Sequence, residues 1–414
     1  MRALKLIGGV VAAALVAVGV SLALVGASGV PHYAVPKLEL HVEVTPSRVE
    51  HGRLLSGMLC AECHRDPATQ VFSGREITDL PRQFGRAWSQ NITRDPVDGI
   101  GSWSDGELAV IIRTGIHRDS HYSPPWMVKL PNISDEDLAS IIAYLRSDAP
   151  ELAARKGRQP AGQPTLLAKL LFRLVMKPLP LPTGPIATPK LADDKVAFGH
   201  YLATGVLGCF ACHSKDFSSN NELKPELSAG FFGGGNAMPD INQRIISTAN
   251  LTPDAETGLG RWSESDFRRA LQDGFRPDHR PVRAPMPRYP NLSDDWSDAL
   301  FAYLRSVPAI SNRVVREDAP QLATNASAGE RAYRTYACGS CHGDSGLGTY
   351  DLRGAGAKYA HDEELIAWIR DAPKQKPGTP MPRWNGVIAE SDYQPLADYV
   401  RLLGKRAQEQ AAGR

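Results

Sequence analysis

Cysteine is scarce in this sequence and occurs in only three places. The 414 residues include six cysteines, and all six belong to three Cys-x-x-Cys-His pentads that begin at Cys60, Cys209 and Cys338. No cysteine is left to form a structural disulfide outside the pentads or to complete a four-thiolate zinc site. Excess charge is also small, because 47 basic and 45 acidic residues leave a net charge of +2. This balance is too slight to indicate nucleic acid or another strongly acidic partner, and we expect no nucleic acid.

The common catalytic motifs are missing as well. No Gly-rich dinucleotide fingerprint follows a strand pattern, and no Gly-x-Ser-x-Gly elbow occurs. The acidic residues cluster at the starts of predicted helices, where helix capping explains them. We therefore expect no catalytic residues in this chain, and the substrate of any assembly that contains it is expected to bind elsewhere.

The three pentads predict three covalently bound haem c groups. In this pattern the two thiols form thioethers with the haem vinyl groups, and the adjacent His binds the iron. A redox-active dithiol would not need the following His. The predicted attachment residues are Cys60, Cys63, Cys209, Cys212, Cys338 and Cys341, and the predicted proximal ligands are His64, His213 and His342.

Three methionines are candidates for the sixth iron ligand. Met127, Met286 and Met381 follow their pentads, and each lies in a Pro-rich loop just before the last predicted helix of its segment. Prolines on both sides of Met286 and Met381 stiffen loops that would otherwise have little reason to carry an apolar residue. These residues predict irons with one His and one Met ligand, a pattern typical of electron transfer.

Two of these ligand assignments have rivals in the sequence. His117 and His121 lie close to Met127 and could replace it, which would give an iron with two His ligands. Met238 lies in an inserted loop and competes with Met286. We favour Met286, because Met127 and Met286 occupy equivalent positions, 159 residues apart, in an internal repeat.

The internal repeat relates two long segments without a gap. Residues 91–147 recur at 250–306 with a constant offset of 159, whereas the first two pentads are only 149 residues apart. Ten additional residues therefore lie between His213 and Asn250, in a Gly-rich stretch that we interpret as an enlarged loop. Each copy follows the order helix, pentad, long loop, helix, Met loop, helix, and sheet signals are scarce.

This order predicts an all-α protein with three class I-like cytochrome c domains in tandem. Ser134 and Ser293 are expected to cap the last helix of the first two domains. A Pro-rich linker with one helix separates these domains; we expect the helix to dock on its neighbour, and contact with a membrane surface is the alternative. The predicted ranges are 45–148, 191–310 and 322–405 for the domains and 149–190 for the linker.

The N-terminus, residues 1–32, is expected to engage a membrane. Arg2 and Lys5 precede an uncharged run of about 25 residues, long enough to cross the hydrocarbon layer as a helix. We expect an uncleaved anchor, and the small residues around Ala27 leave a cleavable signal open as the alternative. The positive-inside tendency places the rest of the chain on the periplasmic side of the inner membrane.

Three features together resemble one family. They are the three pentads, the segment from Asn250 to Phe267 (Asn-Leu-Thr-Pro-Asp, then Thr-Gly-Leu-Gly-Arg-Trp-Ser-Glu-Ser-Asp-Phe) and the segment from Ala284 to Asp294 with its Ala-Pro-Met-Pro. The chain resembles the tri-haem cytochrome c subunits of bacterial membrane-bound dehydrogenases, such as alcohol, gluconate and aldehyde dehydrogenases, over about residues 45 to 405. Pro-Trp-Met127 in the first domain departs from the Pro-Met-Pro of the other two. With the long apolar N-terminal run, this departure tilts the resemblance slightly toward subunits associated with molybdenum hydroxylases.

The resemblance implies an electron-transfer subunit rather than an enzyme. Its partner would be a catalytic dehydrogenase subunit, either a quinoprotein, a flavoprotein or a molybdenum hydroxylase, and its electron acceptor would be ubiquinone or a terminal oxidase. The alternative is a haem enzyme, such as a peroxidase or a small-molecule reductase, in which one iron keeps an open coordination position.

Overall fold

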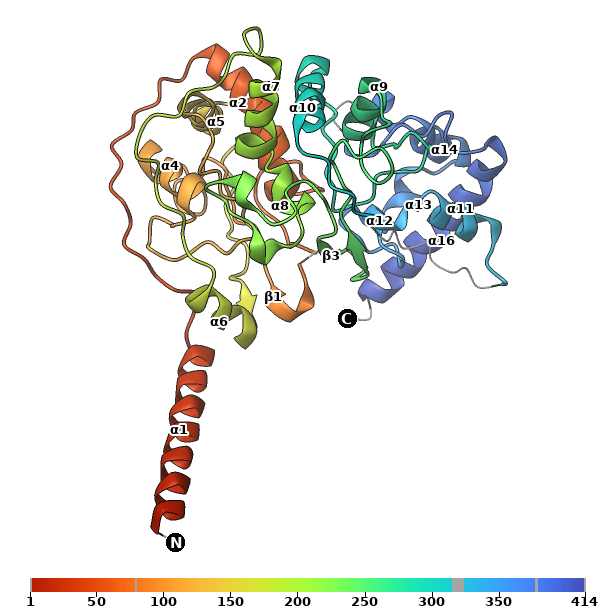
Figure 1. Ribbon diagram of the computed structural model, residues 1–414. Coiled ribbons are helices and arrows are strands. Elements are labelled where there is room, and N and C mark those ends of the chain that lie inside the picture. The colour runs from red at the N-terminus through yellow and green to blue at the C-terminus, as the bar shows by residue number, and fades with distance from the viewer. Residues whose placement is uncertain (1, 79, 315–323, 377–378, 413–414) are drawn as a thin grey trace.

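The structure is rich in helices and is a computed structural model that describes residues 2–78, 80–314, 324–376 and 379–412 (Figure 1). The predicted start of the third domain at residue 322 lies outside these residues. The α-helices are α1 (Arg2–Ala27), α2 (Pro46–Leu59), α3 (Ala61–His64), α4 (Asp105–Thr114), α5 (Asp135–Arg146), α6 (Leu166–Leu174), α7 (Lys195–Tyr201), α8 (Cys209–His213), α9 (Glu264–Arg268), α10 (Asp294–Ser306), α11 (Ala328–Thr335), α12 (Gly339–His342), α13 (Ala355–Lys358), α14 (Asp362–Arg370), α15 (Ala372–Gln375) and α16 (Tyr393–Ala412). Two π-helical turns, Leu202–Val206 and Arg269–Asp273, extend α7 and α9.

One close helix–helix crossing occurs three times, each time beside a pentad. In the first, α2 crosses α5 so closely that a Cβ atom on Gly52 would lie 1.8 Å from the carbonyl oxygen of Ser140 and 2.9 Å from Cβ of Tyr144. Only glycine allows the two backbones to approach in this way. The same crossing joins α7 to α10, where Gly199 meets Ala299 and Tyr303, and α11 to α16, where Gly329 meets Pro395 and Tyr399.

The last helices of the first two pairs begin where the sequence predicts. The Ser134 hydroxyl accepts a hydrogen bond from the Asp137 amide at the start of α5, and the Ser293 hydroxyl accepts one from the Trp296 amide at the start of α10. Both serines have the extended backbone of an N-cap. The two predicted caps are therefore confirmed.

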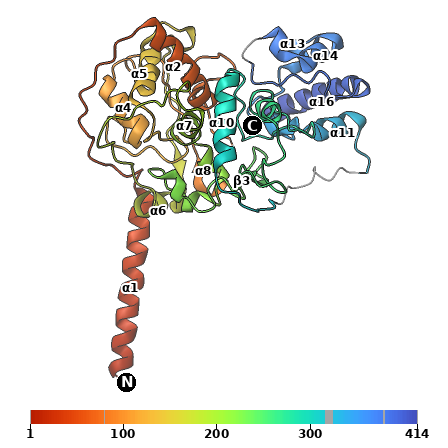
Figure 2. The same cartoon turned by 45° about the horizontal axis from the view of Figure 1, so that its top comes forward.

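Two apolar cores hold the described residues together. The first contains side chains from both sister helix pairs, including Leu55, Ile141, Leu202 and Leu300, so the first two predicted domains share one continuous core. The second contains side chains of α11, α14 and α16, and Phe275 from the preceding segment joins it. Figures 1 and 2 show α7 and α10 between the α2–α5 pair and the α11–α16 pair.

Extended structure is limited, within the described residues, to two short antiparallel pairs and some isolated bridges. Strand β1 (Gly85–Arg86) pairs with β2 (Gln163–Pro164), and β3 (Ala237–Pro239) pairs with β4 (Ile245–Ser247). The second pair is a hairpin, with Met238 opposite Ile246. The first repeat copy pairs at the equivalent place through the isolated bridge between Glu76 and Trp88, so the hairpin belongs to the plan that both copies share. The additional residues lie before it, because the Gly234 amide donates to the His213 carbonyl as the Gly74 amide donates to the His64 carbonyl.

Helix α1 projects from the rest of the chain, and α6 lies at the point where it joins (Figures 1 and 2). Residues Val10–Ala27 are long and apolar enough to cross a membrane, with a mean hydropathy of 2.5. Arg173 of α6 donates hydrogen bonds to Ser28 Oγ at 2.6 Å and to the Gly29 carbonyl at 2.7 Å. Helix α6 buries Phe172 against the first core region but leaves Leu174 73% exposed. One face of the linker helix is therefore docked, and the other is apolar and open.

Candidate functional site

The pentads form short helical turns, and the first two of them line a large cavity. The cavity has a volume of about 2200 Å³ and reaches the residues of the first two pentads. It extends to Arg334–Ala337, directly before the third pentad. Helices α3, α8 and α12 carry the pentads, and each follows the first helix of a crossing pair. The crossings therefore fix the positions from which the three pentads project.

Each pentad histidine is oriented in the same way. His64 Nδ1 lies 2.7 Å from the Gln90 carbonyl, His213 Nδ1 lies 2.8 Å from the Ala249 carbonyl, and His342 Nδ1 lies 2.6 Å from the Tyr350 carbonyl. A carbonyl oxygen only accepts, so Nδ1 carries the proton and the lone pair lies on Nε2. Burial lowers the pKa of all three imidazoles. Neutral imidazoles with a free Nε2 are suited to binding iron.

A buried Asn-x-Thr motif positions two of these carbonyl acceptors. Asn91 Oδ1 accepts hydrogen bonds from the Thr93 amide at 2.9 Å and the Thr93 hydroxyl at 2.7 Å, and Asn91 Nδ2 donates to the Arg155 carbonyl. The carbonyl that binds His64 belongs to Gln90, the residue directly before this motif. Asn250 and Thr252 repeat the arrangement beside Ala249.

Sequence reasoning missed this role of the motif. The partner histidine lies 26 residues before Gln90 and 36 residues before Ala249, so no local pattern links the motif to a pentad. One signal for this role was available in the sequence. The Asn and the Thr of the motif both recur in the second repeat copy at the offset of 159 residues.

The pentad thiols lack the properties of an activated dithiol. All six cysteines are free, and burial raises the pKa of Cys60, Cys209 and Cys338 to about 12 and that of Cys212 to about 11. Thiol–disulfide exchange needs a thiolate, which catalytic dithiols obtain from a lowered pKa. The environment of these thiols therefore fits the attachment of a large apolar group better than redox exchange.

The structure brings several candidate sixth ligands to the cavity. Met127 and Met286 both line it, and the Met127 sulfur accepts a hydrogen bond from Ser123 Oγ at 3.2 Å. Met238 on β3 and the side chains of His117 and His121 also line the cavity. The rivals predicted from the sequence thus lie in the same cavity as the favoured residues. Met381 packs against the second core.

The β3–β4 hairpin contacts the third pentad directly. Asn242 Nδ2 donates to the Gly339 carbonyl at 3.0 Å, and Asn242 Oδ1 accepts from the Asp344 amide at 2.9 Å. Arg244 pairs with Asp240 at 2.9 Å and with Asp344 at 3.2 Å. The β3–β4 hairpin of the second repeat copy therefore holds the third pentad in place.

Comparison with known proteins identifies the family. A family model described as cytochrome c oxidase, cbb3-type, subunit III, matches residues 324–400. A dihaem cytochrome c-type protein of Cereibacter sphaeroides is 30% identical over 269 residues, which cover 61% of this chain and 82% of that protein. The chain belongs to the c-type cytochromes.

Other relatives of this cytochrome are subunits of dehydrogenases. It is 30% identical over 301 residues to one of the subunits of the nicotinate dehydrogenase of Pseudomonas putida, covering 70% of this chain and 24% of that protein. It is 29% identical over 314 residues to the cytochrome c subunit of the quinone-dependent alcohol dehydrogenase of Komagataeibacter europaeus, covering 70% and 63%. The cytochrome therefore spans less than two thirds of the length of these two relatives.

Proposed function

We propose that this cytochrome is a tri-haem electron-transfer subunit of a membrane-bound dehydrogenase and has no catalytic residues of its own. The observation that carries the proposal is the threefold recurrence of one arrangement. At each pentad, a glycine-mediated helix crossing precedes the two cysteines, and the histidine donates Nδ1–H to a backbone carbonyl. Three haem c groups, each in a domain of its own within the ranges 45–148, 191–310 and 322–405, account for this recurrence.

The residues that would hold the haems are those predicted from the sequence. The thioether bonds are assigned to Cys60, Cys63, Cys209, Cys212, Cys338 and Cys341, and the iron ligands to His64, Met127, His213, Met286, His342 and Met381. When bound, haem iron supplies one-electron redox chemistry. The chain supplies neutral imidazoles, apolar walls that exclude water, and loops that present thioether sulfurs.

The equivalence of Met127 and Met286 supports the methionine assignment. Both occupy the same position in the repeat, and both line the cavity. Met238 also lines the cavity. Its backbone is held in the β3–β4 hairpin, where it pairs with Ile246, so we favour Met286 over Met238 as the iron ligand. Ligation by methionine at all three irons would leave no open position for peroxide or another small substrate.

The partner and the acceptor are proposed from the relatives and the N-terminal helix. Relatives are subunits of nicotinate, alcohol and gluconate dehydrogenases, which supports a catalytic dehydrogenase partner. The acceptor would be ubiquinone or a terminal oxidase. Helix α1 would anchor the cytochrome in the inner membrane, with the haem domains on the periplasmic side.

Purification from membranes of the native host tests this function. We expect three haems per chain in a pyridine haemochrome assay, and a dehydrogenase subunit that co-purifies and reduces these haems when its substrate is added. Haem oxidation on addition of a ubiquinone analogue would support the quinone as acceptor. A chain recovered alone, with a high-spin haem that reacts with peroxide, would instead support the haem-enzyme alternative.

A further inference from the structure

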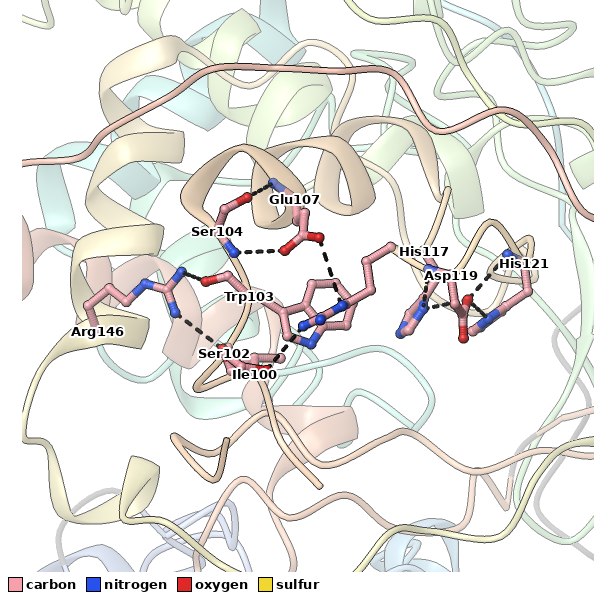
Figure 3. A network of polar contacts seen from close by, with 10 residues as sticks. Ile100, Ser102, Trp103, Ser104, Glu107, His117, Asp119, His121 and Arg146 are labelled. Carbon is pink, nitrogen blue, oxygen red and sulfur yellow. Dashed lines mark hydrogen bonds and ion pairs between the residues drawn. The ribbon is translucent and has the colours of Figure 1, made fainter. Parts of the chain in front are cut away.

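Two imidazoles share one carboxylate in the loop after α4. His117 Nδ1 lies 2.7 Å from Asp119 Oδ1, and His121 Nδ1 contacts the same oxygen. The two rings are stacked, with centroids 4.1 Å apart. Figure 3 shows Asp119 between His117 and His121. The imidazoles are partly buried, whereas the Asp119 side chain is 61% exposed, so the cluster is open to solvent on one side.

The loop is rigid enough to hold this cluster. Its ends pair as an isolated bridge between Ile116 and Tyr122, and the His117 amide donates to the His121 carbonyl at 3.0 Å. Ser120 has a φ of 74°, which closes the turn. The edge of the Trp103 ring lies against His117, with centroids 4.5 Å apart. The three side chains are therefore presented by a fixed turn.

The second repeat copy contains the same turn with different side chains. Arg276, Asp278 and Arg280 occupy the positions of His117, Asp119 and His121, each 159 residues later. The Arg276 amide donates to the Arg280 carbonyl at 2.9 Å, and Arg276 pairs with Asp278 at 3.1 Å. The turn is thus formed equally well with two arginines, so the fold does not require imidazoles at these positions.

We propose that His117, Asp119 and His121 form a binding site for a divalent transition-metal cation such as Zn²⁺. Their ligand atoms all lie within 4.8 Å of one another, as required for ligands about 2.0–2.2 Å from a common ion. The cation would replace the protons that the two Nδ1 atoms share with the carboxylate. A guanidinium has no lone pair to donate, so the equivalent turn of the second copy cannot bind the ion.

The site would act on the first haem domain. All three residues line the haem cavity, so a bound divalent ion would place positive charge beside that cavity. Positive charge favours the reduced, less positive state of a haem, so the ion would raise the reduction potential of the first haem. This inference rests on the proposed function at one point, because it needs Met127 rather than a histidine as the ligand of that haem.

Zinc binding by the purified full-length holoprotein tests the site. Isothermal titration with ZnCl₂ is expected to show one equivalent bound, and Asp119→Asn is expected to weaken it at least about tenfold. The double variant His117→Arg/His121→Arg, which copies the second turn, should fold and abolish binding. Asp278→Asn in the second copy is the matched control and should leave zinc affinity unchanged. Unchanged affinity in the double variant would overturn the proposal.

Spectroscopy of the same variants separates this proposal from the haem assignment. In the double variant, near-infrared magnetic circular dichroism is expected to keep the same low-spin haem signals as the parent. If one low-spin haem is lost instead, the histidines bind iron, and both the zinc site and the Met127 assignment are wrong. The haem count from the pyridine haemochrome assay would still test the tri-haem proposal independently.

Discussion

At the residue scale, three glycines allow pairs of helices to cross closely. Gly52, Gly199 and Gly329 each face a backbone carbonyl oxygen that a Cβ atom would approach to 2.0 Å or less. Because the pentad follows each of these helices, the glycine sets the distance between the pentad and the last helix of the pair.

Gly52→Ala is predicted to destabilise the first helix pair. The new methyl group would lie 1.8 Å from the Ser140 carbonyl oxygen, so the helices must separate, at a cost of at least about 1–3 kcal/mol. Thermal unfolding followed by circular dichroism measures the change. Gly57→Ala in the same helix is the control: nothing lies within 4 Å of its Cβ, and it should be neutral or stabilise by about 0.5–1 kcal/mol. Equal effects of the two variants would contradict the packing argument.

His51 is predicted to make stability depend on pH. Its hydrogen bond to Asp137, 2.7 Å long, raises the pKa of the imidazole. Protonated His51 therefore stabilises the fold fully below the unfolded pKa of about 6.5, and this contribution is lost as the pH rises through the higher folded value. His51→Gln should lower the melting temperature more at pH 6 than at pH 8.5. A difference that is the same at both pH values would count against this pairing.

At the element scale, the β3–β4 hairpin connects the segment of the second pentad to that of the third. It contributes Asn242 and Arg244 to the segment around the third pentad, and the Phe275 ring meets the Trp384 ring with centroids 5.1 Å apart. The position of the third pentad relative to the second therefore depends on side chains that the hairpin and Phe275 present.

Asn242→Ala is predicted to loosen the third unit selectively. The change removes the partner of the Gly339 carbonyl and of the Asp344 amide. The free energy of unfolding should fall by about 1 kcal/mol for each lost hydrogen bond. Hydrogen exchange should become faster in α11 and α12 and stay unchanged in α2 and α5. Ile245→Thr is the control, since Ile245 is exposed on the neighbouring strand. Faster exchange throughout the chain would mean that the hairpin does not act locally.

Sequence patterns predicted those features whose determinants lie close together in the chain. The pentads and the serine caps are local, and Ser134 and Ser293 were identified from a few neighbouring residues. The contact of Asn242 with Gly339 and the acceptor for His64 depend on residues far apart in the sequence, so no local pattern contains them. The repeat revealed that residues had been added before Asn250, but no local pattern predicts that β3 and β4 pair as a hairpin.

At the scale of the whole molecule, one end combines α1 with the open face of α6. Leu166, Leu167, Leu174 and Val175 are exposed on α6, beside the end of α1. An apolar helix face with Lys169 and Arg173 nearby is typical of contact with the interfacial region of a membrane. The sequence predicts that this helix docks on its neighbour, and one face of α6 does so. The other face is open and could contact a membrane surface, which is the alternative that the sequence left open.

Leu174→Glu/Val175→Glu is predicted to weaken membrane association once α1 is removed. In a chain whose residues 1–30 are replaced by a cleavable leader, these changes remove apolar side chains that are 73% and 66% exposed. Co-sedimentation with anionic lipid vesicles should fall several-fold. Leu227→Glu, at a site 67% exposed elsewhere on the body, should leave sedimentation unchanged. An equal loss in both variants would show that α6 makes no specific membrane contact.

The central claim is that three haems with His and Met ligands form an electron relay. Near-infrared magnetic circular dichroism of the oxidised full-length protein tests it most directly, with protein concentration determined by amino-acid analysis. We predict low-spin His/Met signals equivalent to three haems per chain. A signal for fewer than three, a high-spin component or a bis-His component would contradict this account.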